Sequence, residues 1–409
     1  MDDRHRSSSV PAVVGDRACG LVRAAGRRID TPAFIYDEGQ VLHGVEGLSR
    51  LGAEAGCKVL FTLKPLTIVD ILQLMAPHVS GFAASSLFEA RLAREVIRDQ
   101  GTVHVTTPGF RPDEIHELAE VCDYVAFNSL SQWSRYGRDV AGKARCGLRI
   151  NPKLAFVEDD RYNPCRRHSK LGVPVAQLVA EAGGGADRLD GISGLHFHTN
   201  CDSGTFQPLL ETVRSVDAHL SGLLESMEWV NLGGGYLFGE KTDLGPFRQA
   251  VRLLRDKYKV EVFIEPGASL VRAAGSIVAS VIDLFDSDGK TIAVLDTTVN
   301  HMPEVFEYQF CPPVAGHVES GRHRYVLAGC TCLAGDVFGE YAFHEPLEIG
   351  ARIVFADAGA YTMVKWHWFN GVRLPAIYAL TESGELVLRK RFTYEDFVAR
   401  CGGNANVAF

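Results

Sequence analysis

Lys64 is the first residue of this sequence whose position suggests covalent chemistry. It follows the mostly apolar run 59–63 and precedes Pro65, so it is expected at the end of a buried strand. An apolar environment destabilises the ammonium form, and a lysine there can act as a nucleophile that forms Schiff bases. Taken alone, a lysine that closes a strand and extends its charge into water is the simpler interpretation. The groups at neighbouring strand ends must decide between the two.

Three consecutive glycines follow a later apolar run. Gly233, Gly234 and Gly235 come directly after 229–232. Without side chains in the way, their backbone amides could close around a phosphate, and loops after late barrel strands often hold one. A flexible turn is the alternative interpretation.

Glu265 ends the next apolar run and is followed by a Pro-Gly turn. A buried carboxylate needs a cationic partner. A protonated pyridine nitrogen would supply one, and that proton would make the ring an electron sink. An ion pair with a barrel arginine such as Arg149 is the alternative.

Two histidines alternate along the run 192–198. The two-residue spacing of His196 and His198 places both on one face of a strand. No carboxylate at ligand spacing accompanies them, which disfavours a metal site. We predict that one imidazole lies flat against a cofactor ring and that the other packs in the core.

Two further features have structural interpretations by default. Ser86 and Glu89 have the S-x-x-E spacing of a helix capping box. Cys332, viewed as an isolated cysteine, is expected to be a small buried hydrophobic residue.

The elements that must position these residues repeat along the chain from residue 37. Amphipathic helical stretches alternate with short apolar or β-branched runs. The predicted strands are 58–64, 79–85, 102–107, 124–128, 146–151, 192–198, 229–232 and 260–265, and the helices between them include 66–76, 87–99, 112–121, 206–224 and 246–256. Eight such repeats predict an α/β fold, a (β/α)8 TIM barrel, with an open doubly wound sheet as the alternative.

The C-terminal third has a different pattern, with short strands joined by turns. These strands are predicted at 276–285, 292–297, 324–328, 352–355, 376–380 and 385–389. We therefore predict three divisions: an N-terminal segment, 1–36, whose strand packs with a β domain; a barrel, 37–275; and a mostly β domain, 276–409.

The composition excludes several classes of protein. A chain of 409 residues with a net charge of -8 and no basic cluster is not typical of a nucleic-acid-binding protein. Ten scattered cysteines without metal-ligand spacing predict reduced thiols, as in the cytosol. Neither a signal sequence nor a membrane-spanning run is evident, so we expect a cytoplasmic protein.

In this order along the chain, these motifs resemble the fold-type III pyridoxal-phosphate decarboxylases, which include the ornithine and diaminopimelate decarboxylases. The resemblance covers about residues 31–380 and includes Cys332 and the stretches 359–362 and 369–371. Within this family the chain looks most like the carboxynorspermidine (carboxyspermidine) decarboxylases. The segments that carry this closer similarity are 127–130, 295–296, 301–305 and 331–336.

The resemblance implies pyridoxal 5'-phosphate as the cofactor. Lys64 would be the Schiff-base lysine and Glu265 would face the pyridine nitrogen. The other cofactor-binding residues would be Arg149, His198, Gly233, Gly234, Gly235 and Tyr361.

The resemblance also implies α-decarboxylation of a carboxy-polyamine or a basic amino acid, as in polyamine biosynthesis. Cys332 would be the proton donor after loss of carbon dioxide, acting in the other subunit of a homodimer with shared active sites. Asp296, Glu304 and Asp336 are the expected contacts for a cationic substrate. Leu333 stands where ornithine and diaminopimelate decarboxylases carry an acidic residue.

Several departures from the family pattern concern the substrate more than the cofactor. They are Thr62 and Pro65 beside the lysine, Ala268, and the stretches 199–201 and 311–313. A decarboxylase of another amino acid in a specialised pathway, an amino-acid racemase and a non-catalytic cofactor-binding relative are the alternatives. Glu265 favours decarboxylation, because racemases that resemble alanine racemase place an arginine at the pyridine nitrogen.

Overall fold

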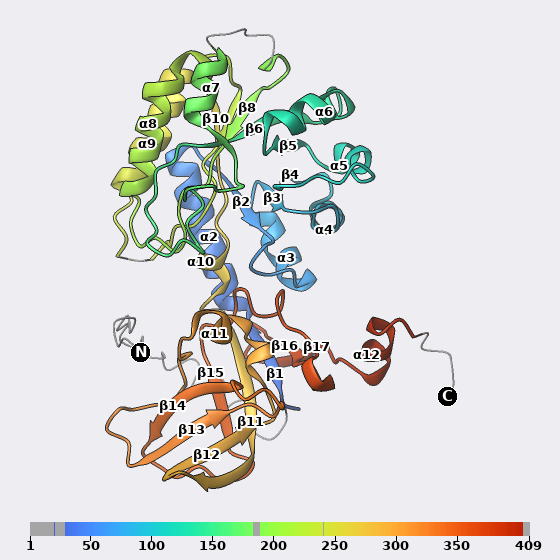
Figure 1. Ribbon diagram of the computed structural model, residues 1–409, viewed down its shortest axis with the longest axis vertical. Coiled ribbons are helices and arrows are strands. Elements are labelled where there is room, and N and C mark those ends of the chain that lie inside the picture. Colours follow the sequence, from blue (N-terminus) through green and yellow to red (C-terminus); the bar gives the residue numbers. More distant parts are fainter. Residues whose placement is uncertain (1–19, 21–28, 183–188, 240, 404–409) are drawn as a thin grey trace. The chain divides into compact units, whose positions relative to one another are not determined.

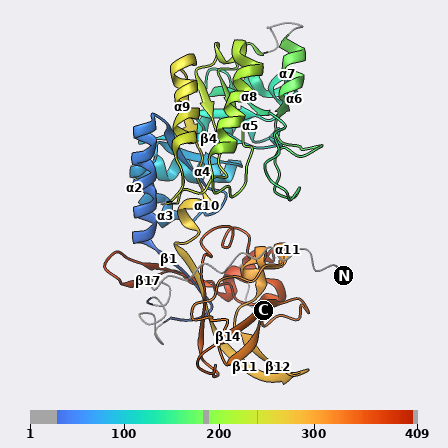
Figure 2. The same ribbon diagram turned by 90° about the vertical axis from the view of Figure 1, so that its left-hand side faces the viewer.

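The computed structural model describes residues 20, 29–182, 189–239 and 241–403 (Figure 1). The chain divides into two compact units. One is Val41–Leu270, and the other joins Met1–Gln40 to Val271–Phe409. A second view of the elements within each unit is given in Figure 2.

Eight parallel strands of the first unit close into a barrel. They are β2 (Lys58–Thr62), β3 (Gly81–Ala84), β4 (Thr102–Thr106), β5 (Tyr124–Phe127), β6 (Arg145–Asn151), β8 (Gly194–His196), β9 (Trp229–Asn231) and β10 (Glu261–Ile264). Each pairs with the next, and β10 pairs with β2. A short strand, β7 (Val173–Pro174), extends β6. The closure confirms the predicted TIM barrel and excludes the open doubly wound sheet.

Helices lie around the outside of these strands (Figure 1). They are α2 (Glu38–Ala55), α3 (Val69–Met75), α4 (Leu87–Ile97), α5 (Ile115–Val121), α6 (Leu130–Val140), α7 (Val175–Ala182), α8 (Gln207–Leu224), α9 (Gly245–Tyr258) and the short α10 (Ala268–Val271). In α9 the buried residues Phe247, Val251 and Leu254 recur at spacings of three and four, so one face of this helix is buried.

Most barrel strands end one or two residues earlier than the sequence predicts. The prediction for β2 extended to Lys64, that for β8 to His198 and that for β10 to Glu265, whereas the strands end at Thr62, His196 and Ile264. The residues with chemistry therefore lie in the loops just beyond the carboxyl ends of the strands, where barrel enzymes place their active sites.

Aromatic side chains fill the barrel near the beginnings of its strands. Tyr124 and Trp229 each begin a strand, and their ring centroids are 5.3 Å apart. His104 stacks on Tyr124 with a centroid distance of 4.0 Å. Gly194 makes room for the indole, because a Cβ there would lie 2.0 Å from Trp229. This filled end is part of the barrel's packed core.

The second unit is built on a sheet in the order β14-β13-β12-β11-β1-β16-β17, with β15 also paired to β11. Its strands are β1 (Ala33–Asp37), β11 (Gly275–Ser287), β12 (Lys290–Leu295), β13 (His323–Ala328), β14 (Val337–Phe343), β15 (Arg352–Phe355), β16 (Ala376–Leu380) and β17 (Leu386–Lys390). Strand β1, from the N-terminal part of the chain, runs antiparallel to β11 and parallel to β16.

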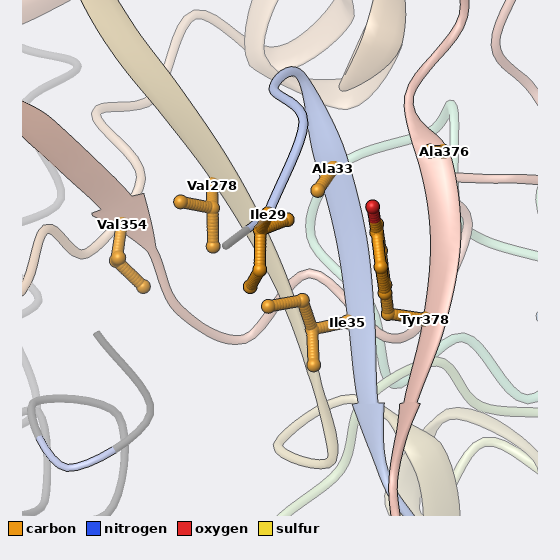
Figure 3. Close-up of a cluster of buried hydrophobic side chains, with 7 residues drawn as sticks. All are labelled: Ile29, Ala33, Ile35, Val278, Val354, Ala376 and Tyr378. Carbon is orange, nitrogen blue, oxygen red and sulfur yellow. The ribbon is translucent and has the colours of Figure 1, made fainter. Parts of the chain in front are cut away.

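A buried apolar cluster holds β1 in the centre of this sheet (Figure 3). Its members are Ile29, Ala33, Ile35, Val278, Val354, Ala376 and Tyr378. The predicted mostly β domain is confirmed. The sequence reading missed β14 and the helices α11 (Pro303–Tyr308) and α12 (Tyr394–Arg400). In β14 the adjacent Gly339 and Glu340 interrupt the alternating pattern on which a strand prediction depends.

Within the described residues, no helix is both long and apolar enough to cross a membrane.

Candidate active site

Lys64 lies two residues beyond the end of β2, in a turn that packs on the loop after β10. The Thr62 amide donates to the Pro266 carbonyl at 3.1 Å. Gly267 approaches this turn so closely that a Cβ there would lie 2.6 Å from Thr62 Cγ2 and 2.9 Å from Pro65 Cγ. Thr62 and Pro65, which depart from the family pattern, are thus the surface on which the Pro-Gly turn packs.

The surroundings of Lys64 favour its neutral amine. Lys64 itself is exposed to solvent, although its neighbours Leu63 and Pro65 are buried. Even so, desolvation by the surrounding protein lowers the pKa of the ammonium group; Glu265 and Glu89 oppose this shift and Arg149 adds to it. A lowered pKa increases the fraction of nucleophilic amine near neutral pH.

Glu265 is a buried carboxylate that stays ionised. Its Oε1 accepts a hydrogen bond from Asn231 Nδ2 at 2.8 Å and lies 3.7 Å from His196 Nε2. Burial raises the pKa of Glu265, but the protonated forms of His196, Lys64 and His198 together outweigh burial and lower it to about 2. Among the described residues, no ion pair joins this carboxylate to Arg149.

The two histidines have different environments. Burial lowers the pKa of both imidazoles, so each is neutral near pH 7. His198 Nδ1 accepts a hydrogen bond from the Gly234 amide at 3.0 Å, which leaves the ring proton on Nε2. Neither ring nitrogen of His196 is hydrogen-bonded to a described residue. The glycine turn thus fixes the orientation of His198.

The glycine turn requires glycine at each position. Gly233 and Gly235 have φ angles of 66° and 90°, which side chains disfavour. At Gly234, a Cβ would lie 2.1 Å from the Glu265 carbonyl oxygen. The Gly233 amide donates to Asn231 Oδ1 at 2.9 Å. Two of the three amides are therefore engaged within the barrel, and the turn connects the residues around it into one framework.

Asn231 is a site residue that the sequence reading missed. It is 2% exposed, and its two amide atoms bridge Glu265 and Gly233. Its position at the carboxyl end of β9, two residues before the first glycine, could have indicated a role in the site.

Glu89 was interpreted only as part of a capping box. Ser86 does cap α4 by accepting from the Glu89 amide at 3.3 Å, and the Glu89 carboxylate accepts from the Ser85 amide at 2.7 Å. Burial also raises the pKa of this carboxyl group, and it interacts with Lys64. Glu89 therefore has both a capping role and a place in the environment of the lysine.

Arg149, in β6, has the character of an anion-binding residue. It is 8% exposed, and burial lowers its pKa to about 10. Its guanidinium group makes no hydrogen bond to another residue in the described part of the chain. Because buried guanidinium groups require acceptors, this one is suited to an anionic group of a ligand.

In the second unit, Cys332 lies on an exposed loop between β13 and β14, so the default expectation of a buried cysteine was wrong. Its amide donates to Asn370 Oδ1 at 2.8 Å. Tyr361 has a φ angle of 56°, in the left-handed region that bulky residues rarely adopt.

The three acidic residues predicted to contact substrate have different partners. Asp296 accepts from the Ser280 amide at 2.8 Å and is only partly buried. Glu304 lies 3.4 Å from Lys365 Nζ, and burial raises the pKa of its carboxyl group. Asp336 is 3% exposed, and its oxygens accept hydrogen bonds within the Cys332 loop.

Metal chemistry has no candidate site in the described residues, where no three potential ligands of the His, Cys, Asp and Glu types come together. None of the nine described cysteines forms a disulfide with another; Cys19 lies outside the described residues.

Comparison with known families agrees with this architecture. Residues 33–359 match the family model described as "Pyridoxal-dependent decarboxylase, C-terminal sheet domain". The chain belongs to the pyridoxal-dependent decarboxylases, enzymes that release carbon dioxide from their substrates.

Similar proteins within this family have narrower names. The chain is 35% identical over 389 residues to the carboxynorspermidine/carboxyspermidine decarboxylase of Campylobacter jejuni, which covers 91% of this chain and 99% of the relative. It is 36% identical over 386 residues to the carboxyaminopropylagmatine decarboxylase of Synechocystis. This match covers 91% of this chain and 96% of the relative. The crystal structure of Campylobacter jejuni carboxynorspermidine decarboxylase complexed with norspermidine matches this structure with a TM-score of 0.82 and 32% sequence identity. The match covers 91% of this chain and 100% of that chain.

Proposed function

We propose that this decarboxylase removes the α-carboxylate of a carboxy-polyamine and replaces it with a hydrogen. Similar enzymes are named for carboxynorspermidine, carboxyspermidine and carboxyaminopropylagmatine. The observation that carries the proposal is the position of Lys64 and Glu265 just beyond the carboxyl ends of β2 and β10, where the pKa of the lysine is lowered and the buried glutamate is ionised.

The residues of the barrel fit pyridoxal 5'-phosphate as the cofactor. Lys64 offers an amine suited to an aldehyde, Glu265 a carboxylate suited to a pyridinium N–H, and Arg149 a guanidinium suited to an anionic group. When bound, this cofactor supplies an electron sink for the bond that releases carbon dioxide.

The barrel residues have separate tasks in this proposal. Lys64 would hold the cofactor covalently through its amine. Glu265, held by Asn231, would keep the pyridine nitrogen protonated, and a neutral His198 would pack against the ring. The family resemblance assigns the phosphate to the glycine turn and to Tyr361; in the turn, the Gly233 and Gly234 amides already donate to Asn231 and His198, so the phosphate would need other donors besides these two.

Cys332 Sγ donates the proton that takes the place of the carboxylate. Its position on an exposed loop supports a role towards a second protein chain. We propose a homodimer in which Cys332 of one subunit acts in the barrel of the other.

The substrate's chain of amines is cationic at neutral pH, and carboxylates would bind it. Asp296 and Glu304 are the proposed partners, since both keep some exposed surface. Leu333, next to the proposed proton donor, adds no charge. We expect this apolar residue to favour a long polyamine over a short substrate with a terminal charge.

Release of carbon dioxide tests the function. We expect the purified enzyme, supplied with pyridoxal 5'-phosphate, to act on carboxynorspermidine, carboxyspermidine or carboxyaminopropylagmatine at least about tenfold more efficiently than on diaminopimelate, ornithine, lysine or arginine. Lys64→Ala is the inactive control. A preference for diaminopimelate or ornithine would refute the substrate class, and release that survives Lys64→Ala would refute the site.

A further inference from the structure

We propose that Asn370 and Asp336 are positioning residues that hold the Cys332 thiol where it delivers its proton. This inference rests on the proposed function, in which Cys332 is the proton donor. It differs from the sequence prediction for Asp336, which was a contact to the substrate.

Asp336 holds the loop from inside. Its Oδ1 accepts from the Val299 amide at 2.8 Å, and its Oδ2 accepts from the Thr331 amide at 3.0 Å and from the Thr331 hydroxyl. The carboxylate is 3% exposed, and a Cβ on Gly329 would lie 2.2 Å from Oδ1. With three donors already bound to a buried carboxylate, Asp336 is better suited to organise the loop than to meet a substrate.

Backbone contacts support the same arrangement. The Gly329 amide donates to the Asp336 carbonyl at 2.8 Å, and the Cys330 amide donates to the Thr297 carbonyl at 3.0 Å. These two hydrogen bonds hold the beginning of the loop against its own end and against Thr297. Cys332 itself lies beyond these contacts, at the exposed part of the loop.

Asn370 holds the exposed part of the loop. Its Oδ1 accepts a hydrogen bond from the Cys332 amide at 2.8 Å, which restrains the orientation of that peptide group. Asn370 has a φ angle of 54°, in the left-handed region that asparagine tolerates better than most residues. The backbone of this turn therefore aims a side-chain acceptor at the cysteine from a separate segment of the unit.

The two residues restrain successive peptide groups, those of Thr331 and Cys332. A thiol on an exposed loop without such restraints would sample several orientations, and proton transfer depends strongly on geometry. Loss of either contact should therefore change where the proton goes before it changes whether carbon dioxide leaves.

Misdirected protonation has a distinct product. In the normal outcome, the carbon that loses carbon dioxide takes the proton from Cys332, and the product leaves as an amine with the cofactor regenerated. If the proton goes to the cofactor carbon instead, addition of one water releases an aldehyde, and the amino group remains on the cofactor as pyridoxamine 5'-phosphate. The ratio of aldehyde to amine reports the position of the donor and is insensitive to a general loss of active protein.

The test compares variants of the complete holoenzyme with carboxynorspermidine, or whichever polyamine substrate the enzyme accepts. Asn370→Gly keeps the left-handed backbone and removes the acceptor, whereas Asn370→Asp keeps an acceptor for the Cys332 amide. Asp336→Asn keeps one acceptor oxygen and replaces the other by a donor, so the contacts of either Val299 or Thr331 are lost. Asp396→Asn is a matched control, because Asp396 accepts from the Thr393 amide at 2.8 Å in helix α12 and does not contact the Cys332 loop.

We expect Cys332→Ala to give the largest aldehyde fraction and Asn370→Gly and Asp336→Asn to raise it about threefold or more over the wild type. Asn370→Asp and Asp396→Asn should match the wild type. The positioning role is overturned if Asn370→Gly keeps the wild-type ratio while Cys332→Ala raises it, or if Asp396→Asn raises it equally. An unchanged ratio in Cys332→Ala would overturn it together with the proton-donor assignment, whereas carbon dioxide release by the wild type separately tests the decarboxylase.

Discussion

Replacement of Asn231 by leucine should destabilise the barrel in a pH-dependent way. The Asn231 side chain is 2% exposed, donates to Glu265 Oε1 at 2.8 Å and accepts from the Gly233 amide at 2.9 Å. Leucine is similar in size and makes neither hydrogen bond. Loss of a hydrogen bond to a charged group costs about 1.5–3 kcal/mol, and a buried unpaired N–H costs about 1–3 kcal/mol. We expect a loss of about 3–5 kcal/mol in the free energy of unfolding at neutral pH.

The pH dependence identifies the charged partner. Glu265 has a pKa of about 2 in the folded protein against an ordinary value of 4.5. Because the pKa is lower in the folded protein, the ionised carboxylate stabilises the fold at pH values above the pKa of the unfolded state. This contribution disappears as the pH falls through the pKa of the folded state. Without Asn231 the folded pKa rises, so the carboxyl group of the variant takes up its proton first. The difference between wild type and variant should therefore be largest at neutral pH, and it should shrink as the pH falls below the folded pKa of the variant towards that of the wild type, about 2.

Asn151→Leu is the matched control. Asn151 is equally buried, but its amide donates to the carbonyls of Pro164 and Leu171 and accepts from the Lys153 amide, none of which titrates. Urea denaturation of both variants and of the wild type without added cofactor measures the differences. A pH-independent loss in Asn231→Leu, equal to that of Asn151→Leu, would refute the coupling between Asn231 and the Glu265 charge.

Three further outcomes follow from the site and the barrel. Gly234→Ala should weaken cofactor binding at least about tenfold, because its Cβ would lie 2.1 Å from the Glu265 carbonyl oxygen. Gly204→Ala, whose Cβ would have no atom within 4 Å, should leave the affinity unchanged, and a fluorescence titration with pyridoxal 5'-phosphate measures both. Gly194→Ala should lower the free energy of unfolding by about 1–3 kcal/mol through a clash with Trp229, and an unchanged melting temperature would contradict the packing described for the barrel. Glu89→Gln removes a charge that favours the ammonium form of Lys64. The pH midpoint for covalent cofactor attachment should therefore be lower than in the wild type and in the control variant Glu95→Gln, and a higher midpoint would contradict the electrostatic role of Glu89.

Much of the barrel was predictable because its signals are local. Helical and strand periodicities recur from residue 37, and each of the eight predicted strands is present. The ends of the strands were less predictable, since Lys64, His198 and Glu265 continue apolar runs although they lie in loops. Their backbones leave the sheet to meet partners in neighbouring loops, and such partners are distant in sequence.

Contacts between residues distant in sequence also limited how much of the site could be predicted. Lys64 and the glycines are recognisable from their types and neighbours, but the bridging role of Asn231 depends on Glu265, 34 residues later. Likewise, Asp336 is an acidic residue near Cys332 in the sequence, and only the folded loop reveals the three donors around its carboxylate. Residue types thus indicated the chemistry, whereas the division between binding and positioning required the three-dimensional contacts.

Borohydride reduction followed by peptide mapping tests the central claim, that Lys64 carries the cofactor. The holoenzyme should have a visible absorbance band that borohydride removes, and mass spectrometry should find the reduced pyridoxyl phosphate group on the peptide that contains Lys64. Lys64→Ala should lack both the band and the adduct. An adduct on a different lysine, or a band that persists in Lys64→Ala, would contradict the account.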